Sequence, residues 1–133
     1  MKKYGIIIVL TLFGFLTHTL MNAQDKVHQL SSHILDVTEG KPAPNVKISL
    51  YKQDNNGIWK EVDERVTDFL LMREGEYNHG IYKLRYHTKS YFKGLDKDTF
   101  YPFIEVVFEI VDDTHYHVPI TLSAYGYSTY RGN

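Results

Sequence analysis

The chain has 133 residues, a formal net charge of −1 and no cysteine. This length suits one domain with a single core, and the lack of cysteine excludes disulfides as a source of stability. The basic side chains are scattered among acidic ones, which excludes the basic stripe expected of a nucleic-acid-binding protein.

The N-terminal segment has the order of a secretory signal peptide. Two lysines precede an apolar run over residues 4–20, and the small residue Ala23 follows. The run lacks the roughly 20 clean apolar residues and the basic flank of a membrane span. We therefore expect residues 1–23 to be removed, and residues 24–133 to form one domain in the periplasm or outside the cell. After cleavage, no attachment to a membrane is expected.

Alternation of apolar and polar residues with period two recurs along the mature chain and indicates half-buried strands. The expected strands, in chain order, cover residues 31–37, 46–51, 81–88, 104–111 and 115–122. Turn sequences lie at residues 39–45, 54–57, 78–80 and 112–113. One short helix is expected over residues 89–98, where Gly94 limits its length. The pattern predicts an all-β antiparallel sandwich.

The last expected strand begins with His115-Tyr116-His117. Strand geometry places His115 and His117 on one face, opposite Tyr116, Val118 and the aliphatic residues that follow. If the aliphatic face is the core, the two histidines face water, a metal or another subunit. Histidines spaced in this way suit a metal pair, ordinary surface residues, or acid–base chemistry near neutral pH. The residues alone leave these alternatives open.

A third histidine, His33, lies in the first expected strand. Its neighbours on the same strand face are Leu35 and Val37. A lone histidine among apolar residues is more often structural than catalytic.

Three segments, in their order along the chain, carry a resemblance to a known family. They are SSHILDVTEGKPAPNVKISLYK, KSYFKGLDKDTFYPFIEVVFEI and HYHVPITLSAYGYSTYRGN. Together they resemble the transthyretin-related family, and the Tyr-Arg-Gly near the end is similar to its hydroxyisourate hydrolase branch. The resemblance implies a transthyretin-like two-sheet sandwich of about eight strands with one short helix, assembled as a homotetramer. It also implies hydrolysis of 5-hydroxyisourate in urate degradation, without a metal or an organic cofactor.

The resemblance further implies roles for individual residues. By matching motif, His33 and His117 stand at the positions of the catalytic histidines, one to activate water and the other to orient substrate or move the proton. Tyr130 stands where the family has a substrate contact, and Arg131 would support it sterically or electrostatically.

Two departures from the family pattern bear on the activity. The chain ends in Asn133 where the family has serine. The family's arginine turn, Thr-Asp-x-Asp-Gly-Arg, has no counterpart between residues 67 and 80, where Arg73 is the nearest arginine. A second function therefore stays open, that of a transthyretin-like periplasmic binding protein with weak or no catalysis. A zinc-dependent hydrolase that uses His115 and His117 is a third.

Overall fold

The computed structural model describes residues 29–67, 71–73 and 79–133, with side chains described for residues 29–66 and 79–133. The predicted signal peptide lies outside the described residues. In chain order, the elements are β1 Leu30–Ser32, β2 Ile34–Asp36, β3 Lys41–Pro42, β4 Val46–Gln53, β5 Trp59–Thr67, β6 Leu71–Arg73, β7 Gly80–Tyr86, α1 Thr88–Gly94, β8 Ile104–Ile110, β9 Tyr116–His117, β10 Ile120–Ser123 and β11 Gly126–Thr129. Among these described residues, no helix is long and apolar enough to span a membrane.

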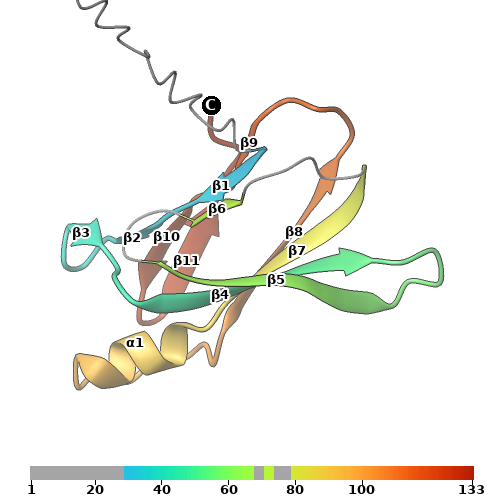
Figure 1. The fold of residues 1–133 in the computed structure, drawn as a ribbon. Helices are drawn as coiled ribbons and strands as arrows, with labels where there is room; N and C mark the ends of the chain where they lie inside the picture. The colour runs from blue at the N-terminus through green and yellow to red at the C-terminus, as the bar shows by residue number, and fades with distance from the viewer. Residues whose placement is uncertain (1–28, 68–70, 74–78) are drawn as a thin grey trace, which may run out of the picture.

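The strands form two facing layers, with α1 at one end (Figure 1). One layer is the antiparallel sheet β5-β4-β7-β8. The other consists of two short sheets, β6-β1-β9 and β11-β10-β2-β3, which follow one another end to end. They are continuous because β1 runs into β2 and β9 runs into β10. The predicted all-β sandwich with one short helix is confirmed.

The second layer contains a parallel pair that the sequence pattern did not predict. Ser31 pairs with His117 and Ile34 pairs with Ile120, so the register is the same on both sides of the interruption. His33 therefore lies opposite Pro119, which has no amide N–H to donate to a ladder. The carbonyl of His33 instead accepts a hydrogen bond from the amide of Ile120 at 3.0 Å. The expected strand over residues 31–37 is thus interrupted at His33.

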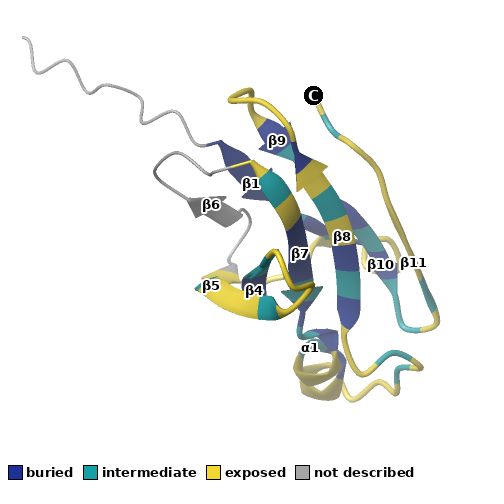
Figure 2. Ribbon diagram, turned by 90° about the vertical axis from the view of Figure 1, so that its right-hand side faces the viewer, coloured by how far each residue is buried: buried dark blue, intermediate teal, exposed yellow. Residues whose placement is uncertain are grey.

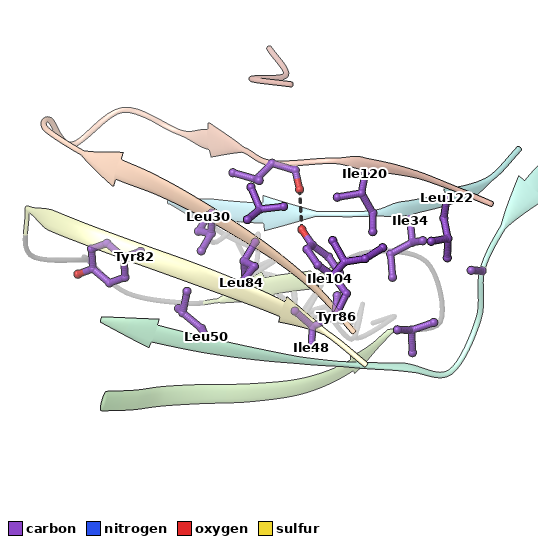
Figure 3. Close-up of a cluster of buried hydrophobic side chains, with 14 of the residues drawn as sticks. Leu30, Ile34, Ile48, Leu50, Tyr82, Leu84, Tyr86, Ile104, Ile120 and Leu122 are labelled. Atoms are coloured by element: carbon purple, nitrogen blue, oxygen red, sulfur yellow. Dashed lines mark hydrogen bonds between the residues drawn. The ribbon is translucent and has the colours of Figure 1, made fainter. Parts of the chain in front are cut away.

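The core lies between the two layers and contains side chains from both (Figure 3). Leu30, Ile34 and Ile120 come from one layer, and Ile48 and Leu84 from the other; each is at most 2 % exposed. At about 25 cal/mol per Å² of buried apolar surface, such side chains provide the main favourable term in folding.

The residues predicted to face the core are buried on four strands, except Phe108 of β8, which is half-buried. The alternation is not strict, because Ser49 of β4 and Lys83 of β7, predicted to face outward, are also buried. The buried set contains Val46, Ile48 and Leu50 of β4, Tyr82, Leu84 and Tyr86 of β7, Ile104, Val106 and Ile110 of β8, and Tyr116, Val118, Ile120 and Leu122 around β9 and β10. His115 is exposed and His117 half-buried, as their parity requires. His33 shares its parity with the half-buried Leu35 and the exposed Val37, so its face is the outer one.

The helix and the C-terminal segment lie at opposite ends of the sandwich (Figures 1 and 2). Helix α1 starts at Thr88 and ends at Gly94, so residues 95–98 of the expected helix lie beyond it. β11 pairs antiparallel with β10, and the last residues continue toward the end where β9 lies. The final residues of the chain are therefore held against the strands that contain the histidines.

Candidate active site

The parallel pairing brings two of the predicted site residues together. His33 comes from the interruption between β1 and β2, and His117 ends β9. Their imidazole ring centroids lie 4.9 Å apart, with the rings inclined by 37°. Both side chains are half-buried on the outer face of their layer. A strand contact across more than eighty residues of sequence thus creates a histidine pair.

A buried serine hydroxyl joins His117 to the third histidine. Ser31 Oγ lies 2.8 Å from Nδ1 of His117 and 2.8 Å from Nε2 of His115. Ser31 has this position because it is the direct cross-strand partner of His117 in the parallel pair. The rings of His115 and His117 are near parallel, at 19°, with centroids 6.4 Å apart.

The surroundings of His117 disfavour its charged form. Partial burial is the largest cause that lowers the pKa of His117 below the usual 6.5, and repulsion by His33 and then His115 lowers it further. A hydrogen bond with the backbone of Ser31 acts in the opposite direction. His117 is therefore neutral near pH 7, the state in which an imidazole accepts a proton.

The C-terminal tail, residues 130–133, packs directly on His117. The amide of Gly132 donates to the carbonyl of His117 at 2.9 Å, and the two residues form an isolated antiparallel bridge. The backbone approaches so closely that a Cβ at residue 132 would lie 2.2 Å from Cδ2 of His117. Only glycine fits this approach, so the tail limits the positions open to the imidazole.

The tail also forms one wall of a cleft at the edge of the sandwich. The cleft has a volume of about 280 Å³ and lies between β8 and the tail, with His117, Tyr130 and Arg131 among its lining residues. This volume is near the lower end for small-molecule pockets, which is about 300 Å³. His33 contacts His117 but is not part of the cleft lining.

Arg131 holds the tail through an aromatic contact. Its guanidinium carbon lies 5.1 Å from the ring centroid of Tyr116, a cation–π geometry. The Tyr116 hydroxyl donates to Oδ1 of Asp112 at 3.1 Å. Arg131 also helps to lower the pKa of Asp112, after the larger effects of the hydrogen bonds from Thr114.

A tyrosine from the opposite layer braces the strands that contain the histidines. The hydroxyl of Tyr86, which is fully buried, donates to the carbonyl of Val118 at 3.1 Å. It also lies 2.7 Å from Oγ of Ser32. These partners are the chain neighbours of His117 and His33. A core side chain therefore fixes a residue next to each of the two histidines.

Two further residues singled out from the sequence lie at the margins of this site. The backbone of Arg73 pairs with Leu30, next to Ser31, but the Arg73 side chain lies outside the described part of the chain. Asn133 is exposed and follows Gly132. Among the residues with described side chains, no group of three or more His, Cys, Asp or Glu could hold a metal ion.

Sequence reasoning missed two parts of the site, Ser31 and Gly132. The serine gave no signal of its own, because its role depends on the pairing of β1 with β9. The glycine had a weak one: it stands beside the predicted residues Tyr130 and Arg131, and a glycine near a chain end commonly permits close backbone approach.

The sequence is similar to those of known proteins along most of its length. The model of the HIUase/Transthyretin family matches residues 30–132. A Caenorhabditis elegans protein named as a probable 5-hydroxyisourate hydrolase is 41% identical over 138 residues, covering 92% of this chain and 97% of that protein.

Solved structures from both branches of the family are similar in fold. Transthyretin from Sparus aurata gives a TM-score of 0.75 at 26% identity, covering 80% of this chain and 97% of that one. The 5-hydroxyisourate hydrolase of Klebsiella pneumoniae gives 0.68 at 27% identity, covering 78% and 92%. The fold alone does not separate the branches, whereas the C. elegans protein, more similar in sequence than either solved structure, is named as a probable hydrolase.

Proposed function

The chain belongs to the HIUase/Transthyretin family, and we propose that it hydrolyses 5-hydroxyisourate, a step of urate degradation, using the outward-facing histidine pair. The observation that carries this proposal is the contact of His33 with His117, at 4.9 Å between ring centroids, in a chain 41% identical to a protein named as a probable 5-hydroxyisourate hydrolase.

The chemistry requires a base, a donor and a pocket. Water attacks a ring carbonyl carbon of the cyclic amide, a base takes the proton of the water, and a donor stabilises the negative charge that develops on the carbonyl oxygen. The carbonyl then re-forms as the ring C–N bond breaks, and the protonated base gives its proton to the departing nitrogen. In our proposal His117 is the base, since its lowered pKa keeps it neutral. His33 orients the substrate or moves the proton onward. Tyr130 contacts the bound ring, and Arg131 supports Tyr130. The reaction proceeds in this scheme without a metal.

A charge-assisted donor is the part that the sequence pattern leaves unassigned. We propose Arg73 for this role because it is the nearest arginine downstream of the missing turn. Losing one such donor typically costs about a hundred-fold or more in rate. Arg73→Ala is therefore expected to slow hydrolysis, and an unchanged rate would show that the donor comes from elsewhere.

The proposal includes a homotetramer in which the outer face of the histidine layer meets another subunit. Support comes from strand edges: β8 and β11 each end a sheet in the described part of the chain. Around them, Val107, Val111 and Tyr130 are exposed, each by more than half. Uncovered apolar edges of this kind favour association. Light scattering on the purified protein would measure the assembly.

We also propose export, with residues 1–23 as a signal peptide that is cleaved after Ala23. Support comes from the order of charge, apolar run and small residue in the sequence. N-terminal sequencing of protein from the periplasmic fraction should begin at Gln24.

The activity is tested by making 5-hydroxyisourate from urate in a cuvette and following its ultraviolet decay. With the mature protein, the decay should be much faster than the spontaneous one, in proportion to protein concentration. Decay at the spontaneous rate would reject the hydrolase and leave a binding protein, which calorimetry with purine-like ligands would then detect.

A further inference from the structure

The contacts of Ser31 impose a restriction on two histidines at once. Its Oγ lies 2.8 Å from Nδ1 of His117 and 2.8 Å from Nε2 of His115. A serine hydroxyl has one hydrogen to donate and lone pairs with which to accept. It can donate to only one of these nitrogens, so at least one of the two imidazoles must donate an N–H to it, which couples their tautomers.

The position of Ser31 shields this coupling from water. Ser31 is only 6% exposed, and it is the cross-strand partner of His117. His117 is half-buried, whereas His115 is exposed. The three side chains form a hydrogen-bonded chain that starts beside His33, passes through a buried hydroxyl and ends at the surface. In such a sheltered position, water competes poorly for the hydroxyl.

Ser31 donates to an imidazole in two of the possible hydrogen-bond arrangements, and one of these two suits catalysis. If His117 has its hydrogen on Nδ1, it donates to Ser31, and its Nε2 is left as an acceptor. Ser31 then donates to Nε2 of His115. In the reverse arrangement, His115 donates to Ser31, Ser31 donates to Nδ1 of His117, and Nε2 of His117 has the hydrogen. An imidazole with a hydrogen on Nε2 has no lone pair there to take a proton from water.

We propose that Ser31 and His115 are positioning residues that hold His117 in the Nδ1–H tautomer, with Nε2 free to accept the proton of the attacking water. The inference rests on the proposed function and deepens it. In the step itself, the water oxygen bonds to the ring carbonyl, its proton moves to Nε2 of His117, and the electron pair of the carbonyl moves to oxygen. The resulting imidazolium keeps its Nδ1–H bond to Ser31, so no proton has to cross the hydroxyl.

The other titratable and charged groups around His117 do not take the place of Ser31 as the partner of Nδ1. His33 and His115 lower the pKa of His117, and Arg131 and Glu109 line the adjoining cleft. The direct Nδ1 contact is with Ser31. In histidine bases, a hydrogen bond at one ring nitrogen usually fixes the tautomer and orientation of the imidazole, leaving the other nitrogen to accept the proton.

The test is the tautomer of His117 in the full mature protein, read from its side-chain nitrogen shifts and long-range proton–nitrogen couplings by NMR. We expect Nδ1–H in the wild type. Ser31→Ala and His115→Phe should each populate Nε2–H, while Ser31→Thr, which retains the hydroxyl, should preserve Nδ1–H. His79→Phe is the matched control, since His79 is an exposed histidine 3.4 Å from Asp113.

Kinetics supply a second readout. Ser31→Ala should lower kcat by about tenfold, a part of the 10²–10⁴ that a positioned base contributes, with KM little changed. Ser31→Thr should restore most of kcat. A wild type with Nε2–H, or a Ser31→Ala variant that keeps Nδ1–H, would overturn the proposal whatever the activity. Because the NMR result needs no substrate, it separates this failure from a failure of the proposed function.

Discussion

Gly132 and His117 are in backbone and side-chain contact: the amide of Gly132 donates to the carbonyl of His117, and a Cβ at residue 132 would stand 2.2 Å from the imidazole Cδ2. Gly132→Ala must therefore displace the ring or the tail. A displacement of about 1 Å at a catalytic group can cost about a hundred-fold in rate, and we expect a loss of that order in kcat/KM.

A matched control for this substitution is available in the same chain. Gly94, the last residue of α1, has no atom within 4 Å of the Cβ that alanine would add. Gly94→Ala should keep wild-type kinetics. If Gly132→Ala also retained them, the tail would have no part in positioning His117.

The lowered pKa of His117 predicts the pH dependence of both activity and stability. Burial, then repulsion by His33 and His115, sets this pKa below 6.5, so kcat/KM should fall on acidification with a midpoint below that value. Between the folded and unfolded pKa values the unfolded chain binds more protons, so the free energy of unfolding also falls as pH drops below about 6.5.

Urea unfolding as a function of pH checks the sign. His87 has a lowered pKa too, chiefly through burial, and contributes in the same direction. In a His87→Asn variant, kcat/KM should still fall on acidification as in the wild type, while the free energy of unfolding should fall less. A protein that became more stable on acidification through this window would contradict the assigned direction.

Tyr86 is expected to stabilise both layers through its hydroxyl. Tyr86→Phe leaves the buried Ser32 hydroxyl and the Val118 carbonyl without this partner, at 2.7 and 3.1 Å. Such a loss costs about 1–3 kcal/mol in free energy of unfolding. Denaturant unfolding measures it, with the exposed Tyr125→Phe as a control expected to change little. Equal stabilities of the two variants would mean that the bridge contributes nothing.

Metal removal is expected to leave hydrolysis unchanged. The nitrogens that His115 and His117 turn toward each other are both in hydrogen bonds to Ser31 Oγ, so they are not arranged as a pair of ligands. Dialysis against a chelator, followed by the decay assay, measures this. A rate that falls and returns on addition of Zn²⁺ would favour the zinc-dependent hydrolase instead.

The sequence was informative where large apolar residues recur at every second position. Tyr82, Leu84 and Tyr86 identified a strand and its inner face, and Gly94 marked the end of the only helix in the described residues. β5, Trp59–Thr67, was missed because it is an edge strand with charged residues along much of its length. Natural sheets commonly place charges on edge strands, which obscures the alternation.

The site was less accessible to prediction than the fold. Motif matching selected His33 and His117, but their contact depends on a parallel pairing that local periodicity does not encode. The same pairing places Ser31 under two imidazoles. Gly132 becomes significant only when the tail is seen to return to His117. Contacts between distant segments thus determine the chemistry, and a single sequence contains little information about them.

The most direct test of the account is the initial rate of 5-hydroxyisourate loss with the wild type, His117→Ala, His33→Ala and the surface control His79→Ala, at one neutral pH and equal concentration. We predict rapid loss with the wild type and with His79→Ala. Each of the other two variants should lose about a hundred-fold or more in rate while remaining folded, as judged by circular dichroism. Wild-type rates in His117→Ala would contradict the account, because the proposed base would then be dispensable.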